Sequence, residues 1–334
     1  MGQNETPLVA AVDLGGSKIL SVVADAHGNI ISRDLRKTSA ARGPEAVIDA
    51  ILESLRGVIS EAGVSASKLC GIGLGAPGVS NPETGVVFTS PNLPGWHDVP
   101  LRDIIARETG LKTLLINDAN AAALGELCFG AARGVRNFIY ITISTGIGGG
   151  IVINGELYGG ASGTAGEIGH MTIADDGPPC TCGNRGCWEQ LASGTALARE
   201  ARRRIGEGAA SVILECAGGN IERVTAEAVS RALDRGDALA AELVAQTSYY
   251  LGVGFANLIN IFNPELIVIG GGLSNMGEKL LSPAYQVAGQ RAFKESYRAV
   301  RFARAELGAD AGVLGAAALI LGKENQAIYL GEGI

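Results

Sequence analysis

One pattern occurs twice in this chain: an apolar strand runs into a turn of glycine and small polar residues, and a second strand leaves that turn. The first copy surrounds the turn at 14–18, and the second surrounds the turn at 144–150. The copies share little sequence, so the repeat is one of architecture. In 334 residues it predicts two α/β domains, each large enough for its own core. We place a small domain at 1–117 plus 307–334 and a large domain at 118–306.

Helical and strand patterns alternate through the rest of the chain. Pro44 opens a segment in which apolar residues recur at helical spacing as far as Ala62. Pro264 ends a second long helical pattern, because proline does not continue a helix. Helices are predicted over 44–62, 101–108, 119–129, 238–260 and 311–321, and strands over 8–13, 19–25, 30–38, 69–74, 112–116, 137–143, 151–154 and 266–269.

Residues 167–189 hold the densest cluster of metal-ligating side chains. Three of the six cysteines, Cys180, Cys182 and Cys187, follow His170 within this segment. Three thiolates and an imidazole form a closed tetrahedral set for Zn²⁺, and the glycines between them allow a tight wrap. The alternative is three thiols with no metal. We predict a structural zinc site in the large domain that holds Glu167 and Glu189 in place.

Charge and hydropathy exclude several classes of partner. A formal net charge of −7 disfavours nucleic acid and anionic membrane surfaces. The basic run at 199–204 lies in an alanine-rich helical context and is interpreted as a solvated helix face. No segment approaches the ~20 apolar residues of a membrane span. Because the cysteines form a metal cluster rather than an even disulfide framework, we predict a cytoplasmic location.

Three glycine-rich turns follow apolar strands, at 15–16, 146–150 and 270–272. Glycines let backbone N–H groups approach an anion closely, so these turns are candidates for phosphate binding. None has the spacing of a P-loop or opens a helix as in a dinucleotide-binding fingerprint. Asp13, at the end of the first strand, either faces a Mg²⁺–phosphate complex through water or forms the turn.

Asp118 follows an apolar strand and precedes an alanine-rich helix. Taken alone, it fits the helix N-cap position best. A carboxylate at a helix N-terminus is also favoured in its ionised form, and an ionised carboxylate can accept a hydroxyl proton. Phosphoryl transfer needs positioning more than a strong base. Asn117 offers a donor and an acceptor for another hydroxyl.

At this point the motifs resemble those of the ROK family of bacterial sugar kinases and repressors, most closely its ATP-dependent glucokinases. The combination of EIGH (167–170) with CTCGNRGCWE (180–189) is highly specific. The likeness runs nearly end to end and also includes DLGGSK (13–18), GLGAPG (73–78), SPNLPGW (90–96), NDANAAALGE (117–126), STGIGGG (144–150), NPELIVIGGG (263–272) and LGADAGVLGAA (307–317).

The resemblance implies a two-domain actin/hexokinase-like (ribonuclease H-like) α/β fold with a ligand cleft between the domains. It implies that Asp118 takes the proton from the sugar 6-hydroxyl and that Mg²⁺ accompanies ATP. It also implies a homodimer or homotetramer. The sugar-contacting positions are Gly78, Asn92, Asn117, Asp118, Glu167, His170 and Glu189. The ATP-contacting positions are Asp13, Gly15, Gly16, Ser17, Lys18, Thr145, Gly146, Gly148, Gly149, Gly271 and Gly272. The zinc ligands are His170, Cys180, Cys182 and Cys187.

Three functions remain open on this reading. The leading one is phosphorylation of an aldohexose, foremost glucose, at the 6-hydroxyl by ATP. Kinases for mannose, fructose, allose, N-acetylglucosamine or N-acetylmannosamine share the motifs, and polyphosphate is an alternative donor. A sugar-responsive repressor is the third. We expect no DNA-binding winged helix, because about a dozen residues precede Asp13, too few for such a domain.

Overall fold

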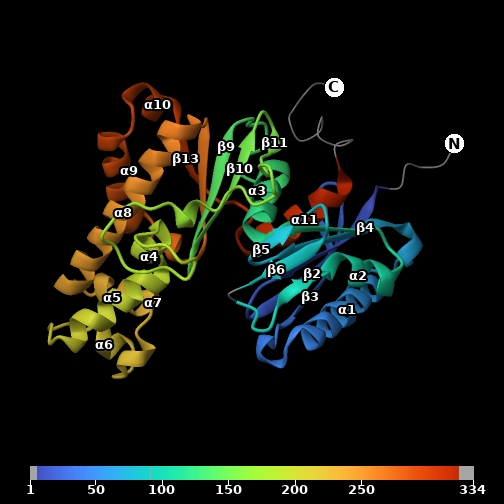
Figure 1. Ribbon diagram of the computed structural model, residues 1–334, viewed down its shortest axis with the longest axis horizontal. Helices are drawn as coiled ribbons and strands as arrows, with labels where there is room; N and C mark the ends of the chain where they lie inside the picture. Colours follow the sequence, from blue (N-terminus) through green and yellow to red (C-terminus); the bar gives the residue numbers. More distant parts are fainter. Residues whose placement is uncertain (1–5, 91, 323–334) are drawn as a thin grey trace. The chain divides into compact units, whose positions relative to one another are not determined.

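The computed structural model describes residues 6–90 and 92–322 (Figure 1). Contacts between Cα atoms divide the chain into two compact units. Unit 1 is 1–140, 150–166 and 304–334, and unit 2 is 141–149 and 167–303. This grouping places 118–140 in unit 1, whereas 118–306 was predicted to form the large domain. The domain boundaries and the cleft between domains stay predictions, and 323–334 lie outside the described residues.

The first sheet belongs to unit 1 and has the strand order β3-β2-β1-β4-β8. β1 pairs antiparallel with β2, and β2 with β3, so the first predicted strand–turn–strand is confirmed. β4 runs parallel to β1, and β8 runs parallel to β4. The strands are β1 Leu8–Leu14, β2 Lys18–Asp25, β3 Ile30–Lys37, β4 Leu69–Ala76 and β8 Thr113–Asn117.

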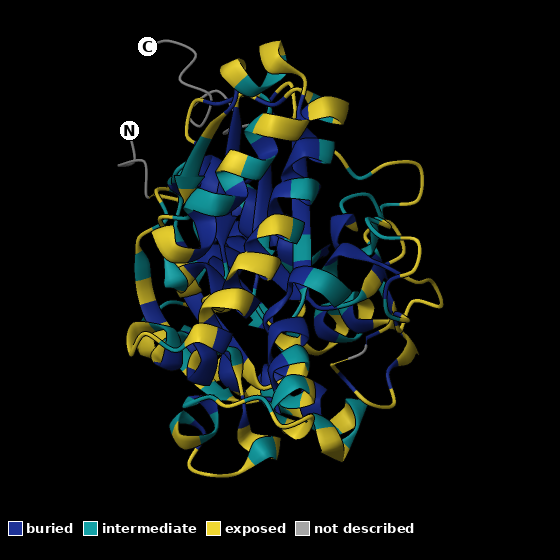
Figure 2. Cartoon of the chain, turned by 90° about the vertical axis from the view of Figure 1, so that its left-hand side faces the viewer, coloured by how far each residue is buried: buried dark blue, intermediate teal, exposed yellow. Residues whose placement is uncertain are grey.

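Helices bury both faces of this sheet. Alternate residues of a strand point to opposite faces, and β1 divides its apolar side chains accordingly. Val12 packs in a core with α1 (Pro44–Glu61) and α2 (Leu101–Thr109). Ala11 packs in a second core with α11 (Ala311–Leu321). Figure 1 shows α1 beside the β2–β3 edge, and Figure 2 shows buried and exposed positions alternating along the helices.

α3 (Asp118–Phe129) continues directly from β8 and packs against α11. The two helices approach so closely that a Cβ on Gly315 would lie 1.6 Å from the carbonyl oxygen of Ala121. Glu126 lies in this interface with no exposed surface. α3 therefore has a fixed position relative to the sheet, and so has Asp118 at its first turn.

The second sheet has the order β11-β10-β9-β12-β13. β9 and β10 form the second predicted strand–turn–strand. β10 begins at Ile147, so Gly148, Gly149 and Gly150 are strand residues and the turn is confined to Ser144–Gly146, shorter than predicted. The strands are β9 Phe138–Ile143, β10 Ile147–Ile153, β11 Glu156–Leu157, β12 Leu266–Gly270 and β13 Arg301–Arg304.

Unit 2 contains the longest helix, α8 (Ala238–Phe262), which packs against α9 (Glu278–Arg291). Asn263 ends α8 in a left-handed conformation, with φ 44°, before Pro264. The other unit 2 helices are α4 Trp188–Ala192, α5 Gly194–Gly206, α6 Ile213–Cys216, α7 Ala226–Asp234 and α10 Lys294–Ala299. Short 3-10 turns include η5 (Gly272–Met276), which follows the third glycine-rich turn.

A small antiparallel sheet, β5-β6-β7, was not predicted. Its strands are β5 Val79–Asn81, β6 Val86–Thr89 and β7 His97–Val99. Strands of three or four residues are too short for an alternating pattern to stand out in the sequence. Within 6–90 and 92–322, every helix is too short or too polar to cross a lipid bilayer.

Candidate functional site

An acidic pair lies at the carboxyl ends of the parallel strands of unit 1. Asp13 on β1 is in register with Gly75 on β4, and Gly75 is in register with Ile116 on β8. Asp118 follows β8 by one residue. Carboxyl ends of parallel strands are the usual ligand-binding edge of an α/β sheet. The fold therefore brings two predicted functional carboxylates to that edge.

Asp13 is packed closely by backbone. A Cβ on Gly312 at the start of α11 would lie 2.8 Å from its Oδ2, and one on Gly75 would lie 3.5 Å from its Oδ1. Burial, reinforced by the negative charge of Asp118, raises the pKa of Asp13 from 3.8 to about 7. A divalent cation beside these two carboxylates would relieve that cost, so Asp13 fits the predicted Mg²⁺-facing role.

The cap of α3 is Asn117, which corrects the expectation that Asp118 occupies the N-cap position. The Asn117 Oδ1 accepts hydrogen bonds from the N–H groups of Ala119 and Asn120, at 2.9 and 3.2 Å. Asp118 is instead the first helical residue. Asn117 also donates from Nδ2 to the carbonyl oxygen of Gly78, at 3.2 Å. The helix start and the Gly78 loop are thus tied together, and the sugar contacts of both residues stay predictions.

Gly78 needs to be glycine where it stands. Its φ is +91°, and a Cβ would lie 2.3 Å from the carbonyl oxygen of Thr89. The first glycine-rich turn is similarly tight, because a Cβ on Gly16 would lie 2.7 Å from the Cβ of Asn92. The N–H of Gly15 donates to the carbonyl of Lys18, which closes the turn. Ser17 and Lys18 are exposed beside it.

The predicted metal ligands converge in unit 2. The four ligand atoms of His170, Cys180, Cys182 and Cys187 all lie within 4.8 Å of one another. The Cys180 Sγ is 3.6 Å from the Nδ1 of His170, and the Sγ atoms of Cys182 and Cys187 are 3.7 Å apart. A tetrahedron with zinc bonds of about 2.0–2.3 Å has edges of roughly 3.6–3.8 Å. The residues present therefore fit a zinc ion.

A knuckle of backbone hydrogen bonds, spanning 171–188, shapes this cluster. The N–H of Cys180 donates to the carbonyl of Asn184 at 2.8 Å, and the N–H of Trp188 donates to the carbonyl of Met171 at 2.8 Å. Gly186 has φ +64°, and a Cβ there would lie 1.6 Å from the carbonyl oxygen of Ala174. The prediction that glycines allow the wrap is confirmed at this position.

The cysteine thiols differ in how readily they ionise. The backbone N–H of Asn184 lowers the pKa of Cys182. Burial, with the neighbouring thiols, raises the pKa of Cys187 to about 12. Because a thiol binds a metal as its thiolate, metal binding at Cys187 displaces the thiol proton, which is released to solvent.

Three predicted sugar-contacting residues also lie together in unit 2. The His170 Nε2 is 3.9 Å from the Oε2 of Glu167, while its Nδ1 faces Cys180. The two predicted roles of His170, metal ligand and sugar contact, would therefore use different ring nitrogens, and the sugar contact stays a prediction. Burial, opposed by His170 and assisted by the charge of Glu189, raises the pKa of Glu167. The carboxylates of Glu167 and Glu189 are near enough to influence each other electrostatically, and their contacts with sugar stay predictions.

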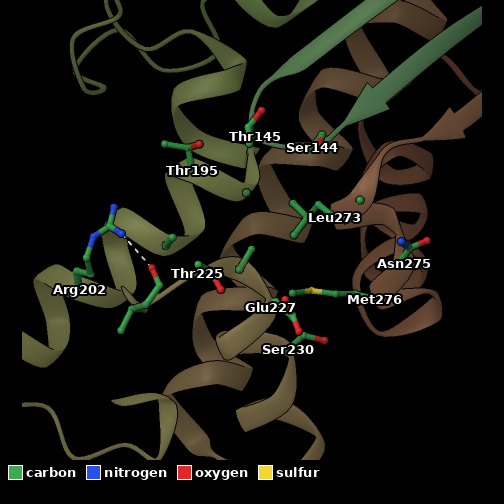
Figure 3. A pocket seen from close by; sticks show the side chains of 15 residues that line it. Ser144, Thr145, Thr195, Arg202, Thr225, Glu227, Ser230, Leu273, Asn275 and Met276 are labelled. Atoms are coloured by element: carbon green, nitrogen blue, oxygen red, sulfur yellow. Dashed lines mark hydrogen bonds between the residues drawn. The ribbon is translucent and has the colours of Figure 1, made fainter. Parts of the chain in front are cut away.

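A pocket of about 700 Å³ opens beside the second glycine-rich turn (Figure 3). Ser144 and Thr145 of the turn and Gly272 of the third glycine-rich turn line it, so two of the predicted phosphate-binding turns meet at one cavity. Gly146, Gly148, Gly149 and Gly271 are not among the lining residues, and their contacts with ATP stay predictions. The full lining is Ser144, Thr145, Gly194, Thr195, Ala198, Arg202, Val224, Thr225, Ala226, Glu227, Ser230, Gly272, Leu273, Asn275 and Met276.

Most of these lining residues were missed by the sequence analysis. Arg202 was assigned to a solvated helix face, but it lines the pocket and donates from Nη1 to the carbonyl of Val224, at 2.9 Å. Thr225 is the N-cap of α7, with its hydroxyl accepting from the N–H of Ala228. A threonine before an amphipathic helix was the available signal, and it indicates a cap rather than a ligand contact.

The ROK family profile matches residues 9–323. The chain belongs to the ROK family. A glucokinase of Halalkalibacterium halodurans is 42% identical over 94% of this chain and 95% of its own length. A xylose repressor of Caldicellulosiruptor bescii is 32% identical over 94% of this chain and 78% of its own length. The chain is therefore similar both to a relative that is a kinase and to a relative that is a repressor.

The fold of this ROK protein is the one seen in solved glucokinases. The ROK glucokinase of Streptomyces griseus, in complex with glucose and AMPPNP, superposes with a TM-score of 0.80 at 36% identity. That match covers 93% of this chain and 98% of the other. The predicted two-domain actin-like α/β fold is confirmed.

Proposed function

We propose that this ROK protein is an ATP-dependent hexose 6-kinase that converts glucose to glucose 6-phosphate. The observation that carries the proposal is the pair formed by Asp13 and Asp118 at the carboxyl edge of the unit 1 sheet. The 42% identity to a glucokinase over almost the whole chain supports the same activity. We also propose a cytoplasmic location, from the cysteine pattern, and a homodimer or homotetramer, from the family resemblance.

Asp118 acts as the base in this proposal. The sugar 6-oxygen forms a bond to the γ-phosphorus of ATP, the bond from that phosphorus to the β,γ-bridging oxygen breaks, and Asp118 takes the hydroxyl proton. Asn117 caps α3 and so holds the carboxylate of Asp118 at the first helical position. Because this transfer depends mainly on positioning and charge neutralisation, a carboxylate is a sufficient base.

Mg²⁺, when bound with ATP, neutralises phosphate charge and orients the γ-phosphoryl group. Asp13 is the residue that would face it, with Gly15, Gly16, Ser17 and Lys18 forming the adjoining turn. The close backbone packing around Asp13 fixes the direction of its carboxylate.

The donor is a nucleotide in this proposal, because the pocket beside Ser144 and Thr145 is larger than a phosphate chain needs. A volume of about 700 Å³ lies within the range typical of small-molecule sites. Leu273 and Met276 offer an apolar wall for a purine base, while Glu227, Ser230 and Asn275 provide polar groups (Figure 3). Polyphosphate would leave most of these residues without a contact.

The sugar hydroxyls are assigned to two sets of residues. Gly78, Asn92, Asn117 and Asp118 belong to unit 1, and Glu167, His170 and Glu189 belong to unit 2. The proximity of Glu167, His170 and Glu189 supports recognition of a polyhydroxylated ligand by several acceptors at once. The four zinc-ligating residues His170, Cys180, Cys182 and Cys187, called the zinc set below, hold the sugar-contacting residues of unit 2 in place.

A coupled assay tests the activity and its substrate together. Purified protein is offered glucose, mannose, fructose, allose, N-acetylglucosamine and N-acetylmannosamine, each with ATP and with polyphosphate. We expect the highest kcat/KM for glucose with ATP. Higher efficiency with another sugar would move the assignment to that kinase, and absence of phosphorylation in every combination would contradict the kinase function.

A sugar-responsive regulator is the second candidate, because the xylose repressor shares 32% identity over 94% of this chain. The net charge of −7 disfavours DNA binding by these residues. A gel-shift measurement with genomic DNA fragments, with and without glucose, distinguishes the two functions. We expect no shifted band, and a glucose-dependent shift would support the regulator.

A further inference from the structure

Glu189 contacts the turn that borders the nucleotide pocket, a contact separate from its predicted role toward sugar. Its Oε2 accepts a hydrogen bond from the N–H of Ile147, at 2.9 Å. A Cβ on Gly146 would lie 2.2 Å from the same oxygen. The carboxylate therefore fills the space that glycine leaves beside the Ser144–Gly146 turn and fixes the residue that follows it.

The short helix α4, which carries Glu189, is connected at its N-cap to the set of four metal-ligating residues. Cys187 is the N-cap of α4 and one of the four ligand residues. The Trp188 indole donates to the carbonyl of Tyr250 at 2.9 Å. A Cβ on Gly254 would lie 2.1 Å from that ring, so α4 is pressed directly against α8.

The other end of α4 leads into the same turn. The N–H of Gly194 donates to the carbonyl of Ser144 at 2.7 Å, and the N–H of Thr195 donates to the carbonyl of Thr145 at 3.3 Å. Gly194 and Thr195 begin α5 and line the pocket. The turn is thus held by one hydrogen bond with α4 and by two hydrogen bonds at the start of α5.

Gln190 makes a second connection to the metal set. Its Nε2 lies 3.8 Å from the Cys180 Sγ, and its Oε1 accepts from the Nη1 of Arg199 at 2.8 Å. Arg199 is on α5, the helix that contributes Ala198 and Arg202 to the pocket. Two paths of contacts therefore run from the cysteine ligands to the pocket, one through Glu189 and one through Gln190.

We infer that Glu189 is a positioning residue for the nucleotide-binding turn and that, through α4, occupancy of the zinc set raises the affinity for the nucleotide. This inference rests on the proposed function, because it takes a nucleotide as the ligand of the pocket. Without the carboxylate, the N–H of Ile147 loses its acceptor and the turn loses its support beside Gly146. By linkage, nucleotide binding must also strengthen retention of the metal by the same factor.

The test is nucleotide binding without sugar, which separates this role from any contact of Glu189 with glucose. Calorimetry measures the Kd of AMPPNP with Mg²⁺ for the wild type, Glu189→Gln and Glu189→Ala, each with zinc bound. An amide oxygen still accepts from the N–H of Ile147, whereas alanine does not. We expect about 10-fold weaker binding for Glu189→Ala and at most about 3-fold for Glu189→Gln.

Chelation then tests the coupling. Removing zinc should weaken AMPPNP binding by the wild type about 10-fold and binding by Glu189→Ala much less, because one path is already broken. Glu200, which pairs with Arg203 on α5, supplies the control. Glu200→Gln and Glu200→Ala should bind AMPPNP like the wild type and respond to chelation as fully.

Different results overturn different parts of the account. Glu189→Ala binding AMPPNP as tightly as the wild type would overturn the positioning role, whether or not the kinase activity is real. If chelation weakens AMPPNP binding equally in the wild type and in Glu189→Ala, coupling through Glu189 is overturned. A wild type that phosphorylates glucose but fails these tests leaves the proposed function intact, whereas a wild type that binds no AMPPNP contradicts both.

Discussion

Asp118 and Glu189 both stand in the first turn of a helix, but different forces hold the two helices. α3, which carries Asp118, has 12 residues and packs backbone to backbone against α11. α4, which carries Glu189, has 5 residues; its buried Trp188 packs against α8, and Cys187 at its N-cap belongs to the zinc ligand set. The carboxylate proposed to take the proton is therefore fixed by core packing alone, whereas the carboxylate of Glu189, beside the Ser144–Gly146 turn, is fixed by core packing together with a metal ligand at the helix start.

The comparison predicts that the two regions fail under different treatments. Close packing and buried backbone hydrogen bonds are insensitive to chelators, whereas a metal-held knuckle loses its geometry when the metal leaves. Damage to the α3–α11 interface should lower stability and leave the metal content unchanged. Substitutions in the knuckle at 171–188 should lower the metal content before they have other effects.

The largest effect is expected from Glu126, which is fully buried between α3 and the segment that leads to α11. Its carboxylate accepts from the N–H groups of Ala131, Glu306 and Leu307, at 2.8, 3.2 and 3.0 Å. Glu126→Ala leaves three donors without their acceptor, which costs roughly 3–5 kcal/mol and lowers Tm by roughly 10 °C. Differential scanning calorimetry measures the shift.

Glu126→Gln is the matched control, because one amide oxygen keeps part of the acceptor capacity. Its Tm should lie between those of the wild type and Glu126→Ala, and all three proteins should retain about one zinc per chain. A Glu126→Ala protein with the Tm of the wild type, or one that loses its zinc, would break the proposed separation.

The second prediction concerns the metal. A stringent chelator should remove about one zinc per chain, with activity falling at least about 10-fold and Tm falling with it. Cys180→Ser should reproduce the loss, whereas Cys70→Ser, at an exposed thiol outside the set, should not. Elemental analysis alongside activity checks this, and a metal-free protein with full activity would show that Glu189 is held without zinc.

The smallest effect is a pH dependence from Asp13. Its pKa is about 7 in the folded chain and 3.8 in the unfolded chain, so between those values the folded state binds more protons. Stability therefore falls as pH rises through this window and levels off above pH 7, with a loss of ~1 kcal/mol between pH 6 and 8. Urea unfolding of the wild type and Asp13→Asn, without Mg²⁺, measures it. If the free energy of unfolding depends on pH in the same way in both proteins, Asp13 is not the cause of the dependence.

Local chemistry explains which parts of the site could be predicted from the sequence. His170 and the three cysteines lie within 18 consecutive positions, so their ligand types and the intervening glycines could be recognised without knowing the fold. The strand–turn–strand around 14–18 was equally visible, because its two apolar runs and the turn between them are adjacent in sequence. α11 was predicted with its observed bounds, since its apolar run has clear ends.

Long-range assembly explains what was missed. Thr195, Glu227 and Asn275 come from α5, α7 and η5, and no local motif marks them as neighbours. Asn and Asp are both favourable at the N-cap position, so the sequence alone did not decide whether Asn117 or Asp118 caps α3. The contact between Glu189 and Ile147 joins residues 42 positions apart and leaves no pattern in either segment.

Replacement of Asp118 by asparagine tests the central claim most directly. Asparagine keeps the size of the side chain but accepts no proton at neutral pH. We predict that Asp118→Asn binds glucose by calorimetry with a Kd close to that of the wild type, while kcat with ATP falls by about three orders of magnitude or more. Turnover by Asp118→Asn within about 10-fold of the wild type would contradict the role of Asp118 as the base.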